Sequence, residues 1–558
     1  MNVRANKVLL LASSLATLAL LGTAAYQENV LQEWRQIQRS YQKKLGATGA
    51  KVPHEQLRQI VVPTLGVTDR CVTCHIGMAP GEAPIAGDRL FDRHPGVVHD
   101  PADYGCTICH GGQGRATTAD AAHGRVHFWP EPMVPREFAY AGCGTCHTHL
   151  AVPNLARLER GRAIFERSDC LACHRLDGRG GTLRPGGAGG MEGPDLSRVG
   201  FRGVPKGWFE AHTARAANDP RYQASFGGLT DDERGALEVY LSSRVGAPGL
   251  LEAKALFHTR GCRGCHKVAG VGGSDGPDLT RVGEKDPGRI DFTHVPEPHD
   301  LASYFAEHFR SPAAVVKGSN MPTLGLTEPE IRGLVFYLFS LRRGEIPEAY
   351  WPIDRIEAER FRQREFADDP ATLYGTFCAA CHGPQGEGMR YAGATAFPAI
   401  ANQDFLRIAP DSLLTATIRH GRPGRRMPAW GEREGALREP DIRALARYVR
   451  SLAGGIESEP DPRPARWVQG DAARGRTLYG TNCARCHGAE GRGGEGTALN
   501  NPVLLASATD TYLIETVKRG RRGTSMAGFA EGSTVTATLS PEEVESVVAY
   551  IRSWEVNP

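Results

Sequence analysis

One short motif, Cys-x-x-Cys-His, recurs seven times along this chain and uses every cysteine that the chain contains. The chain has 558 residues and 14 cysteines, so seven pairs leave no thiol for a disulfide, a nucleophile or a zinc site. The copies are Cys71, Cys74 and His75; Cys106, Cys109 and His110; Cys143, Cys146 and His147; Cys170, Cys173 and His174; Cys262, Cys265 and His266; Cys378, Cys381 and His382; and Cys483, Cys486 and His487.

This motif is the attachment signature of c-type haem. Cysteines three positions apart lie about one helical turn apart, so each can form a thioether to one vinyl group of the same porphyrin, and the following His can ligate the iron. A thioredoxin-like motif or a zinc ribbon does not require that His, and disulfide frameworks are typical of short secreted chains. The sequence therefore predicts seven covalently bound haem c groups.

Bulk composition is that of a globular protein, with 41% hydrophobic and 23% charged residues. A net charge of +3 is too small to indicate a nucleic-acid partner. The length predicts about four domains. We expect a mainly α fold: an N-terminal membrane helix, a three-haem module with little regular structure, and four helical one-haem domains.

The N-terminus (residues 1–45) carries an apolar run from residue 8 to residue 26, preceded by Arg4 and Lys7. As a helix it would reach about 28 Å, close to the thickness of a bilayer's hydrocarbon core. It is either a secretory signal or a retained anchor with its basic end in the cytoplasm. Residues 27–45 lack Gly and Pro, so we expect the helix to leave the membrane unbroken, which favours the anchor. Either way, we expect the haem domains in the periplasm of a bacterium, at the inner membrane.

Residues 46–150 form the predicted three-haem module, in which three motifs follow each other too closely for a separate core around each haem. A second nitrogen ligand is the usual way to complete a closely packed haem, and two His ligands lower the reduction potential relative to His and Met. We expect His94, His123 and His99 to be these distal ligands, with His127, His54 and His149 in reserve and Met78 and Met133 as weaker candidates.

The remaining four motifs lie in repeated units of similar design, which we call the fourth, fifth, sixth and seventh units after the motif each contains. Their predicted boundaries are 155–245, 248–343, 365–453 and 466–556. Each has a helix before the motif, a Gly-rich loop after it and a closing amphipathic helix, expected at 230–241, 327–341, 439–452 and 540–554 with N-cap signatures. The fourth and fifth units share the sequences GPDLSRVG and GPDLTRVG, and the sixth and seventh share LYGTFCAACHG and LYGTNCARCHG.

These four units resemble class I c-type cytochromes, in which a Met on a loop before the last helix ligates the iron. The resemblance implies that Met321, Met427 and Met526 are distal ligands. The fourth unit has Gln223 where that Met would stand. There His212, Met191 or a His of the three-haem module would ligate the iron, or the iron would be open.

Two stretches near the implied Met ligands are basic, and an acidic redox partner would be attracted to them. The alternatives are an ordinary solvated surface and pairing to haem propionates. We expect linkers near 246–250, 344–370 and 454–466, of which the middle one contains Tyr350 and Trp351 and is able to pack on a neighbour. The basic residues are His420, Arg422, Arg425 and Arg426, and Lys518, Arg519, Arg521 and Arg522.

Two types of haem ligation on one tethered chain predict an electron-transfer chain in which the reduction potential rises away from the membrane. Electrons would then enter near the membrane and leave at the far units. The N-terminal part, about 20–150, resembles the cytochrome c subunits of bacterial quinol to cytochrome c oxidoreductases, on the sequences EWRQIQRSY, FDRHPG, CTICHGGQG, AAHGRVHFW and CGTCH. This resemblance implies cytochrome b and Rieske-type subunits as partners and a soluble cytochrome or other redox protein as acceptor.

Two alternatives from other classes stay open at this point. A multihaem reductase or peroxidase would need an open iron, for which the fourth motif is the one candidate. A polymerising extracellular haem filament would need closely spaced haems along the full length.

Overall fold

A computed structural model describes residues 3–181, 193–201, 207–218, 229–342, 346–391, 396–433, 435, 437–532 and 536–555. The chain is mainly α, as predicted, and its described strands form three short two-stranded antiparallel pieces. Met191 and Gln223 lie outside the described residues.

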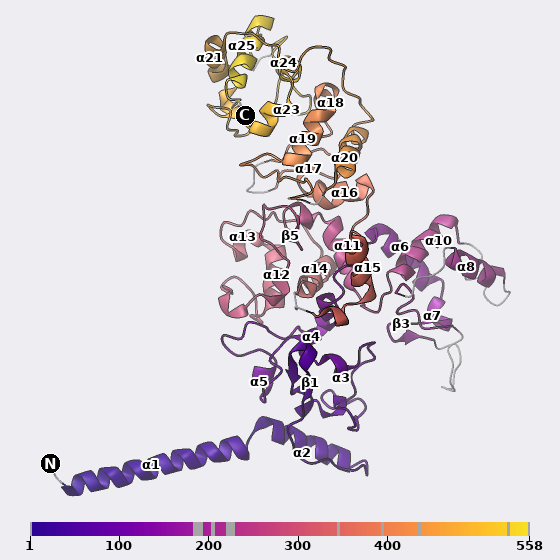
Figure 1. Cartoon of the computed structure of the whole chain (residues 1–558), viewed down its shortest axis with the longest axis vertical. Helices are drawn as coiled ribbons and strands as arrows, with labels where there is room; N and C mark the ends of the chain where they lie inside the picture. Colours follow the sequence, from indigo (N-terminus) through magenta and orange to yellow (C-terminus); the bar gives the residue numbers. More distant parts are fainter. Residues whose placement is uncertain are drawn as a thin grey trace.

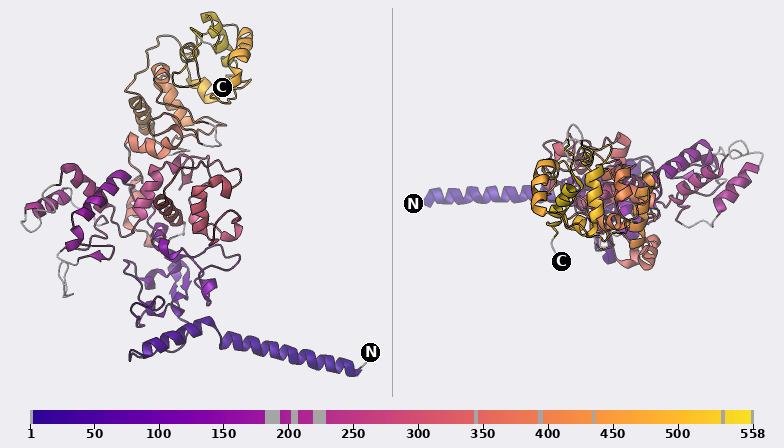
Figure 2. Two further views of the ribbon diagram at one scale, coloured as in Figure 1. Left: turned by 180° about the vertical axis from the view of Figure 1, so that it is seen from behind. Right: turned by 90° about the horizontal axis from the view of Figure 1, so that it is seen from above.

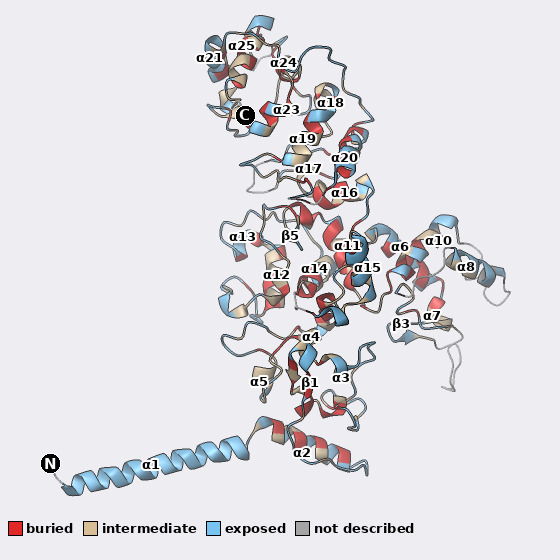
Figure 3. Cartoon of the chain, viewed as in Figure 1, coloured by how far each residue is buried: buried red, intermediate tan, exposed pale blue. Residues whose placement is uncertain are grey.

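The N-terminal helix α1 (Val3–Asn29) is exposed along its whole length (Figure 3). It is long and apolar enough to cross a membrane, with a mean hydropathy of 2.0. A signal sequence shares this length and this apolar composition. The expectation that this helix continues unbroken is wrong. The chain turns at Gln32, where ψ is 135°, and a separate helix α2 (Glu33–Gly46) follows at an angle (Figure 1).

Tertiary packing explains the break. Helix α2 buries Trp34, Tyr41 and Leu45, and the side-chain amide of Gln38 donates a hydrogen bond of 3.0 Å to the carbonyl of Thr73 within the first motif. These contacts tie α2 to the three-haem module, so its direction is set by the module rather than by helix propensity.

The three-haem module has little regular structure, as expected. Its cores are small, with Ile60, Val62, Val67 and Val72 in one of them. The elements are β1 (Ile60–Val62), η1 (Pro63–Leu65), β2 (Val67–Asp69), η2 (Cys71–Thr73), η3 (Ile76–Met78), α3 (Pro101–Tyr104), α4 (Thr107–His110), α5 (Ala119–Ala122) and η4 (Arg136–Thr145).

The four units follow, each with its own helices. The fourth unit has α6 (Leu155–Arg167), α7 (Cys170–Cys173), β3 (Arg175–Leu176), β4 (Arg179–Gly180), α8 (Trp208–Asn218) and α10 (Asp231–Ser242). The fifth has α11 (Leu250–Thr259), η5 (Cys262–Gly264), β5 (Lys267–Val268), β6 (Val271–Gly272), η6 (Val282–Glu284), η7 (Pro287–Arg289), α12 (Leu301–Arg310), α13 (Pro312–Val315) and α14 (Glu328–Ser340). The sixth has α16 (Pro370–Phe377), α17 (Ala379–His382), α18 (Gln403–Ile408), α19 (Asp411–His420) and α20 (Glu439–Leu452). The seventh has α21 (Ala472–Asn482), α22 (Ala484–His487), α23 (Pro502–Ser507), α24 (Asp510–Arg519) and α25 (Pro541–Arg552).

In every unit the helix before the motif packs against the closing helix. Gly161 of α6 makes a close crossing possible, because a Cβ there would lie 2.1 Å from the carbonyl oxygen of Ala236 in α10. Gly475 plays the same part in the seventh unit, against Ser546. The predicted closing helices are confirmed, and capping boxes begin those at Thr230, Thr327 and Ser540.

The order of the units in space differs from their order along the chain. The three-haem module and the fifth, sixth and seventh units form one column, with the C-terminus at the end far from α1 (Figure 1). The fourth unit projects sideways from this column, as both further views agree (Figure 2). The column therefore passes directly from the third motif to the fifth unit.

The segment 346–369, which we call the strap, contacts both the three-haem module and the fifth unit at this junction. It contains η8 (Glu348–Tyr350) and α15 (Ile353–Phe361). The Tyr350 hydroxyl lies 2.6 Å from that of Thr64 in the three-haem module. At the other end, Glu365 forms ion pairs with the buried Lys254 and Arg263 of the fifth unit. The strap thus packs on its neighbours.

Candidate haem-binding sites

The 14 cysteines are all unpaired, and each is partly or fully buried. Burial raises the pKa of Cys143 and of Cys262 to about 12, so these groups are protonated thiols at neutral pH. Among the residues with a described placement, no group of three His, Cys, Asp or Glu side chains converges as a zinc site would require.

Four motif histidines are oriented by the same backbone contact. Nδ1 lies within 2.7–2.9 Å of a carbonyl oxygen in His174, His266, His382 and His487, the acceptors being Pro194, Pro277, Pro398 and Thr497. Because a carbonyl only accepts, Nδ1 carries the proton and Nε2 keeps a lone pair for a metal.

Three pairs of histidines face each other at one characteristic separation. The ring centroids are 6.0 Å apart for His94 and His110, 6.3 Å for His99 and His147, and 6.1 Å for His174 and His212. A metal bonded at about 2 Å to one nitrogen of each ring places the centroids about 6 Å apart. The residues present therefore fit an iron held between two imidazoles.

The first motif lies near His123, the remaining one of the three predicted distal histidines. Burial lowers the pKa of His75, and the charge of His123 lowers it further. Each of His94, His99 and His123 is thus brought to a different motif. The reserves lie elsewhere: His54 and His127 are exposed, and His149 lies 3.5 Å from Glu359. Ligation by the three named histidines stays a prediction.

In the fourth unit, His212 comes from α8 and is held by stacking. Its ring lies flat on that of Trp208, with centroids 4.8 Å and planes 4° apart. This histidine is one of the donors that the sequence suggested for the fourth motif.

The fifth unit contains a donor that sequence reasoning missed. His308 of α12 follows Tyr304 by one turn, with the rings stacked 6.0 Å apart, as His212 follows Trp208 in α8. Its Nδ1 is buried without a hydrogen-bond partner. Burial, with the charges of Lys285 and His266, lowers the pKa of His308 to about 4. Aligning YFAEH of the fifth unit with WFEAH of the fourth would have revealed it.

The implied Met ligands of the last two units sit in matching loops. The carbonyl of Met427 accepts a 2.8 Å hydrogen bond from the Arg422 backbone, and that of Met526 accepts a 2.7 Å bond from the Arg521 backbone. Met427 packs against the core of its unit, and Met321 packs against the core of the fifth. No contact between a Met sulfur and a motif histidine is described.

Motifs of different sites touch each other at two places. The side chains of Cys71 and Cys106 lie close enough to interact, which joins the first and second motifs. Those of Cys265 and Cys381 likewise join the fifth and sixth.

The second and third motifs are also in close contact, and the third motif reaches the fifth unit. A Cβ on Gly142 of η4 would lie 2.0 Å from the Cys109 carbonyl oxygen. On the other side of η4, a Cβ on Gly144 would lie 2.6 Å from Ser340 of α14. Contacts therefore link the first three motifs to one another, the third motif to the closing helix of the fifth unit, and the fifth motif to the sixth.

Three of the eight residues in the basic stretches, Arg426, Arg521 and Arg522, join neighbouring units. Arg522 pairs with Asp404 of the sixth unit at 2.7 Å. Arg521 lies over the Phe405 ring, 4.7 Å from its centroid. Arg426 pairs with Asp275 of the fifth unit. Of the other residues, Arg519 pairs with Glu459 and Glu515, Lys518 with Glu515, Arg422 is half-buried, and Arg425 and His420 are exposed.

Comparison with known proteins agrees with this picture. The Cytochrome c family matches residues 158–244, 250–342 and 472–555, and the family of subunit III of cbb3-type cytochrome C oxidase matches 365–449. The FixP subunit of the cbb3-type cytochrome c oxidase of Bradyrhizobium diazoefficiens is 33% identical over 33% of this chain and 59% of its own length. The cytochrome c subunit of the bc1 complex of Corynebacterium diphtheriae is 23% identical over 38% of this chain and 76% of its own length.

The chain thus spans about 59% of the length of the first of these relatives. Among solved structures, a reducing HAO-like protein complex of Kuenenia stuttgartiensis matches with 18% identity over 34% of this chain and 97% of that chain. Its TM-score of 0.23 is too low to compare the folds.

Proposed function

Since the chain is a multihaem c-type cytochrome, we propose that it is a heptahaem electron carrier that takes electrons near the membrane and passes them along the column to a periplasmic acceptor. The observation that carries this proposal is the continuity of the motifs: the first touches the second through Cys71 and Cys106, and the fifth touches the sixth through Cys265 and Cys381. Bound haem supplies a one-electron iron couple at each site. The protein spaces and tunes these couples.

We propose one pair of axial ligands for each site. The proposed pairs are His75 with His123, His110 with His94, His147 with His99, His174 with His212, His266 with Met321, His382 with Met427, and His487 with Met526. Because a thioether raises the potential relative to a second imidazole, the higher potentials lie in the fifth to seventh units. Electrons then run downhill away from α1.

The fourth unit is a side branch of this path. It meets the column near the third motif, where the charge of Arg198 contributes to lowering the pKa of His99, after burial and His147. Its two-histidine pairing argues against an open iron, and so against the reductase or peroxidase alternative. The filament alternative is disfavoured because the fourth to seventh units carry one motif each.

We further propose that the chain belongs to a membrane complex, anchored by α1 in a bacterial inner membrane with its haem sites in the periplasm. The relatives named as oxidase and bc1 subunits support such a complex. Cytochrome b and Rieske-type subunits are the proposed donors, and a soluble cytochrome or other redox protein is the proposed acceptor.

Two measurements test this function. The mass of the denatured holoprotein should show seven covalently attached haems, and fewer would refute the heptahaem count. Purification from solubilised membranes should bring down a b-type haem or Rieske subunit. A protein that purifies alone but still reduces a soluble cytochrome would remain a carrier and would not be a complex subunit.

A further inference from the structure

The third motif differs from the others in what its histidine faces. The Nδ1 of His147 lies 3.3 Å from the Oδ1 of Asp354, and the two side chains are 11% and 19% exposed. The motif histidines of the four units place the same nitrogen on a backbone carbonyl. Among residues whose placement is described, His147 is the one motif histidine with a carboxylate partner.

Asp354 is brought there by the strap. It lies in the first turn of α15, where the positive end of the helix dipole favours a negative side chain. The same helix places Glu359 3.5 Å from the Nε2 of His149, and the backbone of Glu365 accepts a 2.6 Å hydrogen bond from Val152. The strap is therefore fixed along the segment that follows the third motif, and Asp354 is held in place.

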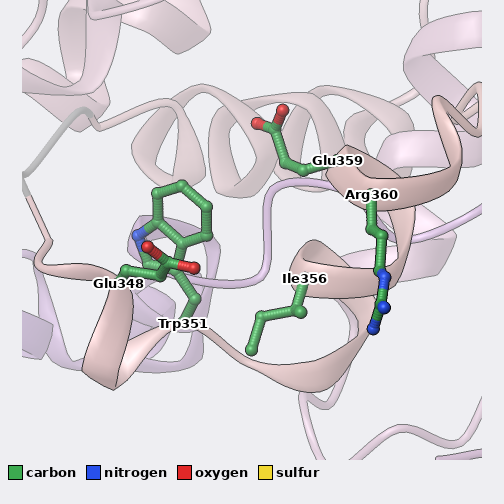
Figure 4. A pocket seen from close by; sticks show the side chains of 5 residues that line it. All are labelled: Glu348, Trp351, Ile356, Glu359 and Arg360. Atoms are coloured by element: carbon green, nitrogen blue, oxygen red, sulfur yellow. The ribbon is translucent and has the colours of Figure 1, made fainter.

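The surroundings leave the carboxylate available to the imidazole. Both oxygens of Asp354 and the Nδ1 of His147 are buried, and none of the three atoms has a hydrogen-bond partner in the structure, so the imidazole and the carboxylate, 3.3 Å apart, are left to each other. The neighbouring Arg355 is directed to the Trp351 ring, 4.0 Å from its centroid, rather than to Asp354. Trp351 also lines a hollow of about 430 Å³ beside α15, with Glu348, Ile356, Glu359 and Arg360 (Figure 4).

We propose that Asp354 accepts the Nδ1 hydrogen bond of His147 and thereby holds the third haem at a lower reduction potential than a carbonyl partner would. This inference rests on the proposed function, in which His147 ligates that haem. A carboxylate that accepts from a ligating histidine makes the ligand more basic, which favours the oxidised, more positive iron. Asp354 is a positioning and tuning residue at the point where the path divides between the fourth and fifth units.

The test is Asp354→Asn in the full-length holoprotein, with Glu357→Gln, an exposed position on the same helix, as control. Potentiometric titration followed by absorption gives the midpoint potentials, and low-temperature EPR distinguishes the signal of one haem among the seven. In Asp354→Asn one low midpoint should rise by at least 59 mV, equivalent to a tenfold change in its reduction equilibrium. One low-spin EPR signal should move with it, and Glu357→Gln should leave all midpoints in place.

Unchanged midpoints in Asp354→Asn, or an equal rise in Glu357→Gln, would overturn the inference. Asp354→Glu, which keeps the charge, decides the case if the Asn variant loses haem: a low midpoint supports the role and a raised one refutes it. Haem counting by mass on the unmodified protein separates failure of this inference from failure of the heptahaem proposal.

Discussion

Arg426 of the sixth unit forms a hydrogen-bonded ion pair with Asp275 of the fifth, and its Nη2 and Nε lie 2.6 and 2.9 Å from one carboxylate oxygen. The pair lies beside the contact between the Cys265 and Cys381 thiols, whose charges act on the same arginine. A charged hydrogen-bonded pair of this kind holds two units in register where their motifs touch.

Asp275→Asn should therefore loosen the joint between the fifth and sixth units. Loss of a charged, partly buried hydrogen-bond partner costs about 2 kcal/mol. We expect an earlier unfolding transition in urea and slower electron equilibration between the two haems after flash reduction. The exposed Arg425 provides the matched control, and Arg425→Gln should change neither quantity. Equal effects of both substitutions would mean that the pair has no special role.

Removing Met321 should have a different outcome from removing Met427 or Met526. In the fifth unit, His308 lies near enough to His266 for their charges to interact, so it can replace the lost thioether. Met321→Ala should leave a low-spin haem at a lower potential. The same change at Met427 or Met526 should leave an open iron that binds carbon monoxide when reduced. Carbon monoxide binding by Met321→Ala would contradict this role of His308.

His212→Ala should open the fourth site, because the substitution removes the ring that faces His174 at 6.1 Å. Absorption spectra should then show a high-spin component, and the reduced protein should bind carbon monoxide in proportion to one haem. Trp208→Leu, which removes the stacking partner but not the donor, should remain low-spin. Carbon monoxide binding by the unmodified protein would instead favour an enzyme with an open iron at the fourth motif.

Local sequence was sufficient for the features that depend on near neighbours. Each of these features depends on a few consecutive residues. They are the motifs, the mainly α fold, and the helix caps at Thr230, Thr327 and Ser540. The matching loops around Met427 and Met526 likewise follow from two copies of one local pattern.

Features that depend on long-range packing could not be predicted in the same way. The break after Asn29 arises because Trp34 and Tyr41 are buried against a distant module. Asp354 reaches His147 only because the strap returns to the third motif. The sideways fourth unit has no local signal at all, since chain order placed it between the third and fifth sites (Figure 1). His308 was accessible in principle, through comparison of repeats.

Glu365 provides a test of how the strap stabilises the column. Burial alone would raise the pKa of Glu365, but the charges of Arg263 and Lys254 outweigh it and hold that pKa well below the ordinary 4.5. The stabilisation is therefore complete above about pH 4.5 and is lost as the pH falls towards the lower, folded-state value. Glu365→Gln leaves two buried cations unpaired and should cost about 3 kcal/mol at pH 7.

Urea unfolding followed by circular dichroism at pH 7 and at pH 3.5 checks the sign. The difference in unfolding free energy between the unmodified protein and Glu365→Gln should shrink at the lower pH, because acid protonates Glu365 in the unfolded chain while the folded protein, with its lowered pKa, still holds it ionised. Glu357→Gln, on the exposed side of α15, should match the unmodified protein at both values. A difference that grows on acidification would mean that Glu365 is protonated in the folded protein, and the strap would then be held by apolar contacts.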